Sequence, residues 1–219
     1  MNNPLDAGAL TLADIAAYPQ HFSYSLTLPS GAPVLFRPLL PNDVTALAAF
    51  LGELSAQTRR FSTYSSYDQA AAGEMCRAIA RYDKLRLVAI PAQDTRHGIC
   101  ALFELSLNLV PADLERYHGY GLDLDPGAVC RFGPCIADAY QNRGLGLRLW
   151  PIMADLARRF GRRRVILWGG VLAGNARAIH YYQKLGFRHH GAFENSAGQL
   201  CYDMSVVFAE KVIDQEHDE

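Results

Sequence analysis

The sequence predicts a protein of the α/β (α+β) class in which helices flank a mixed, mostly antiparallel central sheet. Strand-like apolar runs follow one another in the middle of the chain, and stretches with apolar residues at helical spacing precede and interrupt them. The chain has 219 residues, of which 50% are hydrophobic and 20% charged, so it is long enough to bury a substantial core. Without repeats or an interdomain linker, we expect an N-terminal extension over 1–30, one domain over 31–210 and an acidic tail over 211–219.

Prolines and capping residues mark the elements of the first third of the chain. A short helix is expected within 10–18 and a strand over 33–40, where prolines place the strand near an edge or end of the sheet. Residues 41–43 offer an N-cap to a helix over 44–54, whose apolar residues recur at helical spacing. The polar segment 55–62, which contains two arginines, is interpreted as a turn.

Strands dominate the middle of the chain. An alanine-rich helix over 70–82 leads into two consecutive strands, over 84–91 and 98–107, which a polar turn joins. The segment 110–127 is rich in proline, glycine and aspartate, and this composition predicts an irregular loop. A further strand is expected over 128–137.

Helices and strands alternate in the last third. An amphipathic helix is expected over 144–160, although Pro151 removes one of its hydrogen bonds and predicts a kink. A buried strand over 165–168, a short helix beginning at Asn175 and a last strand over 200–208 complete the order β-α-α-β-β-β-α-β-α-β.

Bulk properties exclude several classes of protein. The net charge of −1 and the pI near 6.6 provide no general attraction to nucleic acid or anionic membranes. Apolar stretches are too short to span a bilayer, and the first residues lack the pattern of a secretory signal. The five scattered cysteines predict reduced thiols in a cytoplasmic protein, and no metal-binding spacing is present. The arginine-rich run 158–164 is interpreted as a solvated helix end, with RNA binding as the weaker alternative.

A glycine-rich turn, QNRGLGL over 141–147, stands between an expected strand and an expected helix. Glycine lets the backbone approach a ligand closely, and N–H groups at a helix N-terminus bind phosphate. A glycine pair before a helix is often only a tight turn. A second motif downstream favours the functional interpretation.

That second motif is NARAIHYYQKLGF over 175–187. The phenol of Tyr182 can hydrogen-bond developing negative charge on a sulfur atom and deliver a proton to it. The alternative is that Tyr182 packs in the core, since Ala178, Ile179 and Leu185 share its helix face.

The two motifs together resemble those of the GNAT superfamily of N-acetyltransferases. Over about 32–208 the order of elements is similar to the GNAT fold, and the opening FRPLLPNDVTALAAFLGELSAQTRRF resembles bacterial GNAT domains that acetylate protein lysines or small amines. Gln141, Gly144 and Gly146 match the phosphate-binding pattern of the family. The resemblance implies that backbone N–H groups bind the pyrophosphate of acetyl-CoA along Arg143, Gly144, Leu145, Gly146 and Leu147.

The resemblance also assigns roles around the thioester. Asn175 would hydrogen-bond the pantetheine arm or the acetyl region, and Tyr182 would protonate the leaving thiolate. Tyr181 is the weaker candidate, because it misses the family register by one residue. The expected strand would pair with pantetheine and help to polarise the thioester carbonyl through the backbone of Cys135, Ile136 and Ala137.

One position departs from the family pattern. Many relatives carry a general-base glutamate where Arg131 stands, and a guanidinium cannot accept a proton from an amine. Glu104 on the preceding strand is the first substitute, with a solvent-facing position as the alternative. Asp123 and Asp125 are weaker candidates, and a chain of water molecules is a further alternative. Arg131 is expected to bind an anionic group of the substrate instead.

The sequence therefore predicts an acyl-CoA-dependent N-acetyltransferase that moves acetyl from acetyl-CoA directly to a primary amine, without a metal. The acceptor is either a small-molecule amine or a protein amino group. The alternative is a catalytically weakened GNAT-like module that binds or senses CoA. Neither a membrane nor a nucleic acid is an expected partner, and the resemblance makes a homodimer a reasonable expectation.

Overall fold

The computed structural model describes residues 9–62, 64–92 and 98–208. Its strands are β1 (Tyr24–Thr27), β2 (Pro33–Pro38), β3 (Lys84–Pro91), β4 (Ala101–Ser106), β5 (Val129–Ile136), β6 (Arg164–Leu167), β7 (Val171–Leu172), β8 (Arg188–Glu194) and β9 (Leu200–Val207). Its α-helices are α1 (Leu12–Ala17), α2 (Val44–Glu53), α3 (Ala56–Phe61), α4 (Gln69–Cys76), α5 (Pro111–Gly119), α6 (Leu145–Arg159) and α7 (Ala176–Lys184).

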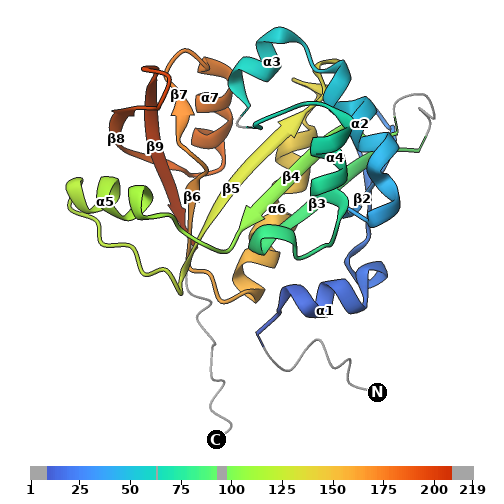
Figure 1. Ribbon diagram of the computed structural model, residues 1–219, viewed down its shortest axis with the longest axis horizontal. Coiled ribbons are helices and arrows are strands. Elements are labelled where there is room, and N and C mark those ends of the chain that lie inside the picture. Colours follow the sequence, from blue (N-terminus) through green and yellow to red (C-terminus); the bar gives the residue numbers. More distant parts are fainter. Residues whose placement is uncertain (1–8, 63, 93–97, 209–219) are drawn as a thin grey trace, which may run out of the picture.

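All the described strands belong to one sheet (Figure 1). Its order is β1-β2-β3-β4-β5-β6-β9-β7, and β8 also pairs with β9. Strands β5 and β6 are parallel, whereas the other pairs are antiparallel. The expected mixed, mostly antiparallel sheet flanked by helices is confirmed.

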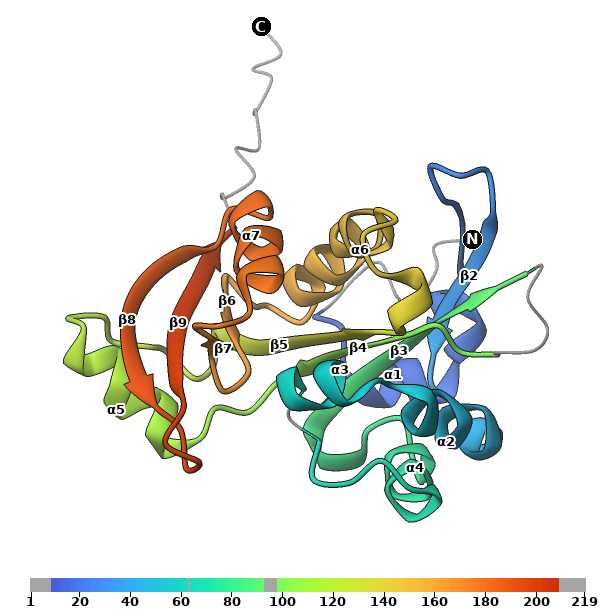
Figure 2. The ribbon, with the colours of Figure 1, turned by 90° about the horizontal axis from the view of Figure 1, so that it is seen from above.

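Helices cover both faces of this sheet (Figure 2). On one face, α6 contributes Leu149 and Met153 to a core that includes Phe132 of β5. On the other face, Leu51 of α2 packs in a core with Val88 of β3. Because alternate residues of a strand point to opposite faces, each central strand supplies both cores.

Buried polar side chains continue the α2 face of the sheet beyond its apolar core. Arg86, Glu104 and Arg131 are only 4%, 5% and 8% exposed. The register pairs Glu104 with Arg86 of β3 on one side and with Gly133 of β5 on the other. Charged side chains are rarely buried in this way unless they are paired or functional, so this end of the sheet is where a site is expected.

Strand β5 has one unpaired edge over its second half. Its pairing with β6 covers only the first four residues, from Val129 opposite Arg164 to Phe132 opposite Leu167. The Trp168 N–H then donates to the Phe132 carbonyl at 3.0 Å. Beyond this point β5 pairs with β4 alone, which leaves backbone groups without a strand partner on the β6 side.

The prediction of an irregular loop over 110–127 is wrong, because this segment contains α5. Pro111 occupies the first turn, where a missing N–H is not needed, and the Asp113 carboxylate accepts the Val110 N–H at 3.2 Å. Tyr117 is fully buried, and its hydroxyl donates to the Met204 carbonyl at 3.0 Å. Contacts with distant β9 thus stabilise a helix whose composition predicts a loop.

The turn expected over 55–62 is also wrong, because α3 lies there. The Ser55 side chain caps this helix by accepting the Thr58 N–H at 3.2 Å. Serine is a favoured N-cap residue, and its signal was outweighed by the polar composition of the segment.

Other boundaries differ from the expectation in smaller ways. The helix expected over 70–82 ends at Cys76, and Tyr82 and Asp83 have φ angles of +64° and +51°, outside the helical region. Strands β1, β7 and β8 were not predicted. Because β1 pairs with β2, the sheet begins upstream of the expected start of the domain.

Candidate active site

A cavity of about 370 Å³ lies beside the unpaired half of β5. Its wall is built from β5, the first turn of α6, the turn after β6 and α7, and Figure 2 shows α6 and α7 side by side above β5 and β6. It brings together most of the residues singled out in the sequence: Glu104, Cys135, Ile136, Gln141, Gly144, Leu145, Gly146, Leu147, Asn175, Tyr181 and Tyr182. Arg131, Ala137 and Arg143 are not on this wall.

The N-terminus of α6 borders the cavity with N–H groups that precede the first helical hydrogen bond. Gly144 caps the helix with a φ of +79°, in the left-handed region that favours glycine. The first hydrogen bond of the helix joins the Arg148 N–H to the Gly144 carbonyl at 3.1 Å. The N–H groups of residues 145–147 precede it and therefore have no partner within the helix. Such a terminus attracts phosphate oxygens. Farther along, α6 continues through Pro151, which lies on its exposed side.

The side chains of Gln141 and Arg143 have different surroundings. Gln141 Nε2 donates to the Ile136 carbonyl at 2.8 Å and to Thr58 Oγ1 at 3.1 Å, which joins the glycine-rich turn to β5 and α3. The exposed Arg143 guanidinium lies 5.8 Å from the centre of the Tyr140 ring. Arg143 does not lie on the cavity wall, so its expected part in binding phosphate through its backbone stays a prediction.

The open edge of β5 presents one backbone donor at the centre of the cavity. Backbone groups alternate in direction along a strand, so the bond of Trp168 to Phe132 places the groups of Pro134 and Ile136 on this edge. Proline has no N–H, and the Ile136 carbonyl already accepts a bond from Gln141. The Ile136 N–H is thus the donor available to polarise a carbonyl bound here.

Asn175 caps α7 at the rim of the cavity. Its Oδ1 accepts the Ala178 N–H at 3.2 Å, and the residue is only 9% exposed. Because this oxygen already accepts a bond from the helix, the amide nitrogen of Asn175 is the group better placed to bind a ligand. The role expected for Asn175 in binding pantetheine is therefore that of a hydrogen-bond donor.

Tyr182 is buried in an aromatic cluster that faces the cavity. Its ring centre lies 5.4 Å from that of Phe187 and 6.5 Å from that of Phe132. Burial raises the pKa of the Tyr182 phenol, with a smaller contribution from Cys135, so the hydroxyl keeps its proton. The neighbouring Tyr181 hydroxyl instead donates to the Gly146 carbonyl at 3.3 Å.

Glu104 is buried at the boundary of the cavity. The alternative interpretation, in which Glu104 faces solvent on its strand, is therefore wrong. Arg86 Nε donates to Glu104 Oε1 at 2.8 Å, and both side chains are almost fully buried. Asp123 and Asp125 are exposed and do not line the cavity. Of the candidate bases, Glu104 alone lies where a substrate can reach it.

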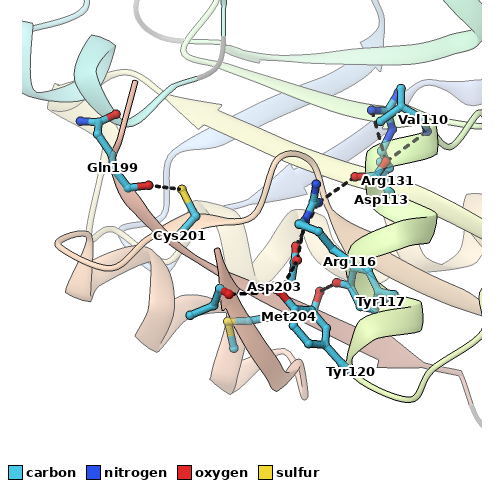
Figure 3. Close-up of polar contacts among 11 residues, drawn as sticks. Val110, Asp113, Arg116, Tyr117, Tyr120, Arg131, Gln199, Cys201, Asp203 and Met204 are labelled. Carbon is cyan, nitrogen blue, oxygen red and sulfur yellow. Dashed lines mark hydrogen bonds and ion pairs between the residues drawn. The ribbon is translucent and has the colours of Figure 1, made fainter. Parts of the chain in front are cut away.

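Arg131 is engaged away from the cavity (Figure 3). Its guanidinium donates to Ser106 Oγ at 3.1 Å, lies 3.6 Å from Asp113 Oδ2 and stacks 4.8 Å from the centre of the Trp168 ring. These contacts engage two of its three nitrogen atoms without a substrate, whereas the buried Nε has no hydrogen-bond partner among the described residues. Arg131 is better placed to support Trp168 than to bind an anionic acceptor.

Thr58, Tyr64 and Trp168 are among the residues of the cavity wall that were not predicted. Trp168 directly follows β6, and Gly169 and Gly170 come next with φ angles of +64° and +68°. These glycines turn the chain away from β5 and open its edge. A tryptophan followed by two glycines after a buried strand was the available signal for this turn.

Gly146→Ala is expected to raise the dissociation constant for CoA by about tenfold, which corresponds to about 1.4 kcal/mol. An added Cβ would lie 2.8 Å from Tyr181 Cε2, so the ring that borders the first turn of α6 must move. Gly73→Ala in α4 is the control, since nothing lies within 4 Å of its added Cβ. The control should bind CoA normally and gain about 0.5–1 kcal/mol of stability. Isothermal titration calorimetry measures CoA binding by both variants, and urea denaturation measures the stability of the control. Normal CoA binding by Gly146→Ala would contradict the packing argument.

Two classes of feature are absent from the described ranges. No helix in them is long and apolar enough to cross a membrane. They also hold no group of three or more His, Cys, Asp or Glu side chains placed to bind a metal ion.

The part of the chain that carries both motifs matches the model of a known protein family. Residues 129–187 match the family model described as the acetyltransferase (GNAT) family. This range begins with β5 and extends past α7, so it contains the open strand edge, the glycine-rich turn and Tyr182. No protein of curated function matches the chain in sequence.

Solved structures share the fold at low sequence identity. The GNAT domain of S. lividans PAT is 19% identical, covers 87% of this chain and 99% of its own, and has a TM-score of 0.67. An acetyltransferase of the GNAT family from Streptococcus pneumoniae is 21% identical, with 80% and 99% covered and a TM-score of 0.57. The aminoglycoside acetyltransferase AAC(6')-Ib, in complex with coenzyme A, is 20% identical, with 80% and 94% covered and a TM-score of 0.58.

Proposed function

We propose that this chain, which carries a GNAT acetyltransferase domain as its two motifs predicted, moves acetyl from acetyl-CoA directly to a primary amine. The observation that carries the proposal is a single cavity bordered by the N-terminus of α6, the open edge of β5 and Tyr182. These three features correspond to the three needs of the reaction. They bind the pyrophosphate, polarise the thioester carbonyl and protonate the leaving sulfur.

The proposed transfer is a direct attack of the neutral amine on the thioester carbon. A C–N bond forms, and the Ile136 N–H stabilises the negative charge on the carbonyl oxygen. When the C–S bond breaks, the Tyr182 hydroxyl donates its proton to the thiolate. The amine nitrogen loses a proton to Glu104, either directly or through water.

A covalent acetyl-cysteine intermediate is not part of this proposal. Burial, with smaller contributions from the nearby carboxylates of Glu104 and Asp138, raises the pKa of the Cys135 thiol to about 12. A neutral buried thiol is a poor nucleophile. The amine therefore attacks the thioester itself.

The comparisons support CoA as the donor and an amine as the acceptor class. AAC(6')-Ib is named for the acetylation of aminoglycosides and was solved with coenzyme A. Because its likeness to this chain is one of fold, the choice between a small-molecule amine and a protein amino group depends on the residues of this chain. We also propose that the protein works in the cytoplasm, where its five buried free cysteines stay reduced. We further propose that it forms a homodimer, and light scattering of the purified protein tests this.

A thiol-release assay tests the proposed activity. Acetyl-CoA is incubated with the protein and a panel of small amines and lysine peptides, while calorimetry measures CoA binding separately. We expect CoA to bind and at least one amine to release free thiol. CoA binding without thiol release from any amine would favour the alternative of a CoA-sensing module, and absence of CoA binding would contradict both.

A further inference from the structure

A second cavity, of about 390 Å³, adjoins the first at its reacting end. The two share Tyr64, Glu104 and Trp168. The second cavity is lined by the segment that follows α3, by α4 and by the beginning of β3. A molecule held there reaches the same Glu104 and Trp168 side chains that border the first cavity.

The carboxylates of this second cavity are already engaged by the protein. Glu104 pairs with Arg86 at 2.8 Å, and Glu74 pairs with Arg81 at 2.8 Å. The exposed Asp68 caps α4 by accepting the Ala71 N–H at 2.8 Å. A polycationic acceptor would thus find few carboxylates available for pairing.

Lys84 is the unpaired charge of this cavity. Its ammonium lies 3.5 Å from the centre of the Trp168 ring and 5.8 Å from that of Tyr82. In the described part of the chain it makes no hydrogen bond or ion pair, although it is half-buried. Burial lowers the pKa of Lys84 to about 8, helped by the charges of Arg86 and Arg131 and opposed by Glu104. A buried cation without a counterion is unfavourable, and an anionic ligand would relieve this cost.

The register of the sheet places Lys84 at a useful distance from the reacting end. Lys84 pairs with Ser106, and Glu104 is the diagonal neighbour on the same face. Diagonal neighbours in antiparallel pairs are about 7–8 Å apart at the backbone, so both side chains can contact the same short molecule. Aromatic and apolar groups from Tyr64, Met75 and Trp168 form the surrounding wall.

We propose that the second cavity is the acceptor site and takes an amino acid-like amine, whose carboxylate binds Lys84 and whose amino group points toward Glu104. This inference rests on the proposed transferase activity and narrows its substrate class. It separates the protein from acetyltransferases of polyamines and aminoglycosides. An apolar side chain on the amino acid would occupy the aromatic wall.

Matched pairs of acceptors test this proposal in the thiol-release assay. L-Methionine and L-phenylalanine are compared with their amides, which keep the amine and lose the carboxylate, and spermidine and kanamycin serve as carboxylate-free amines. We expect kcat/KM for each acid to exceed that for its amide by at least tenfold. Lys84→Gln should remove this preference by raising KM for the acids, so that kcat/KM for each acid falls to about that for its amide. Lys84→Arg should retain it, and Arg188→Gln, on the exposed surface of β8, is the control.

Two results would overturn the proposal: higher kcat/KM for amides or polyamines than for acids, or an unchanged preference in Lys84→Gln. If no amine is acetylated, the proposed transferase activity is contradicted, and a binding experiment tests the second cavity separately. In that case N-acetyl-L-methionine and its amide are titrated calorimetrically into CoA-saturated protein. Binding of the acid that depends on Lys84 would support the site, and its absence would reject it.

Discussion

Replacing Tyr182 with phenylalanine is expected to lower kcat for acetyl transfer by roughly 10²- to 10⁴-fold, the usual contribution of a general acid. Burial raises the pKa of this phenol, so its proton is present throughout the working pH range and is available to the leaving thiolate. The substitution removes only the hydroxyl. The ring contacts with Phe132 and Phe187 remain, and CoA affinity and stability should stay close to those of the wild type.

Two other tyrosines make this experiment specific. Tyr24→Phe in β1 removes a partly buried hydroxyl outside the cavity wall and should leave kcat unchanged. Tyr181→Phe removes the bond to the Gly146 carbonyl, so it should weaken CoA binding more than it lowers kcat. A larger loss of kcat in Tyr181→Phe than in Tyr182→Phe would show that the neighbouring tyrosine is the acid. Steady-state rates and calorimetric dissociation constants separate these outcomes.

The part of the site that we propose to bind CoA could be predicted from the sequence because its determinants are local. A glycine-rich turn requires glycines at fixed positions along one short segment, and α7 places Asn175 and Tyr182 by helical spacing. The structure accordingly brings residues 141, 142 and 144–147 and both side chains to one cavity, whereas Arg143 lies off its wall. Their chemical roles stay predictions until the variants are measured.

The acceptor side was not predictable in the same way, because its residues meet only through the sheet. Lys84, Glu104 and Trp168 come from β3, β4 and the turn after β6, and no local spacing relates them. Because a carboxylate can accept a proton, the sequence predicts Glu104 as a candidate base. Its ion pair with Arg86 depends on the register of two strands and could not be predicted. Lys84 is ordinary in sequence and unusual only because its surroundings leave it without a counterion.

A buried ion network illustrates the same limit for α5 (Figure 3). Asp203 of β9 is 0% exposed and accepts bonds from Arg116 Nε at 2.7 Å and from the Tyr120 hydroxyl at 3.2 Å. Arg116 also donates to Asp113 at 2.9 Å, and Asp113 lies beside Arg131. Glycines, prolines and aspartates around 110–127 predict a loop, but these distant partners convert part of the segment into a helix docked on β9.

Asp203→Ala is expected to lower the free energy of unfolding by about 3–5 kcal/mol, because removal of one partner leaves a poorly solvated charge behind. The Arg116 side chain is only 18% exposed and would keep Asp113 as its one remaining carboxylate. For a chain of this size the loss corresponds to a decrease in Tm of roughly 10 °C.

Asp123→Ala is the matched control, since the Asp123 side chain is 88% exposed and pairs with an exposed His118. Its effect should stay within about 0.5 kcal/mol. Urea denaturation followed by circular dichroism gives both values. A loss in Asp203→Ala no larger than in the control would mean that apolar packing, led by Tyr117, holds α5 on β9 without the ion network. A selective loss would show that the network anchors this helix. Arg116→Met should then lower the free energy of unfolding less in the Asp203→Ala background than in the wild type, because the two side chains act as one unit.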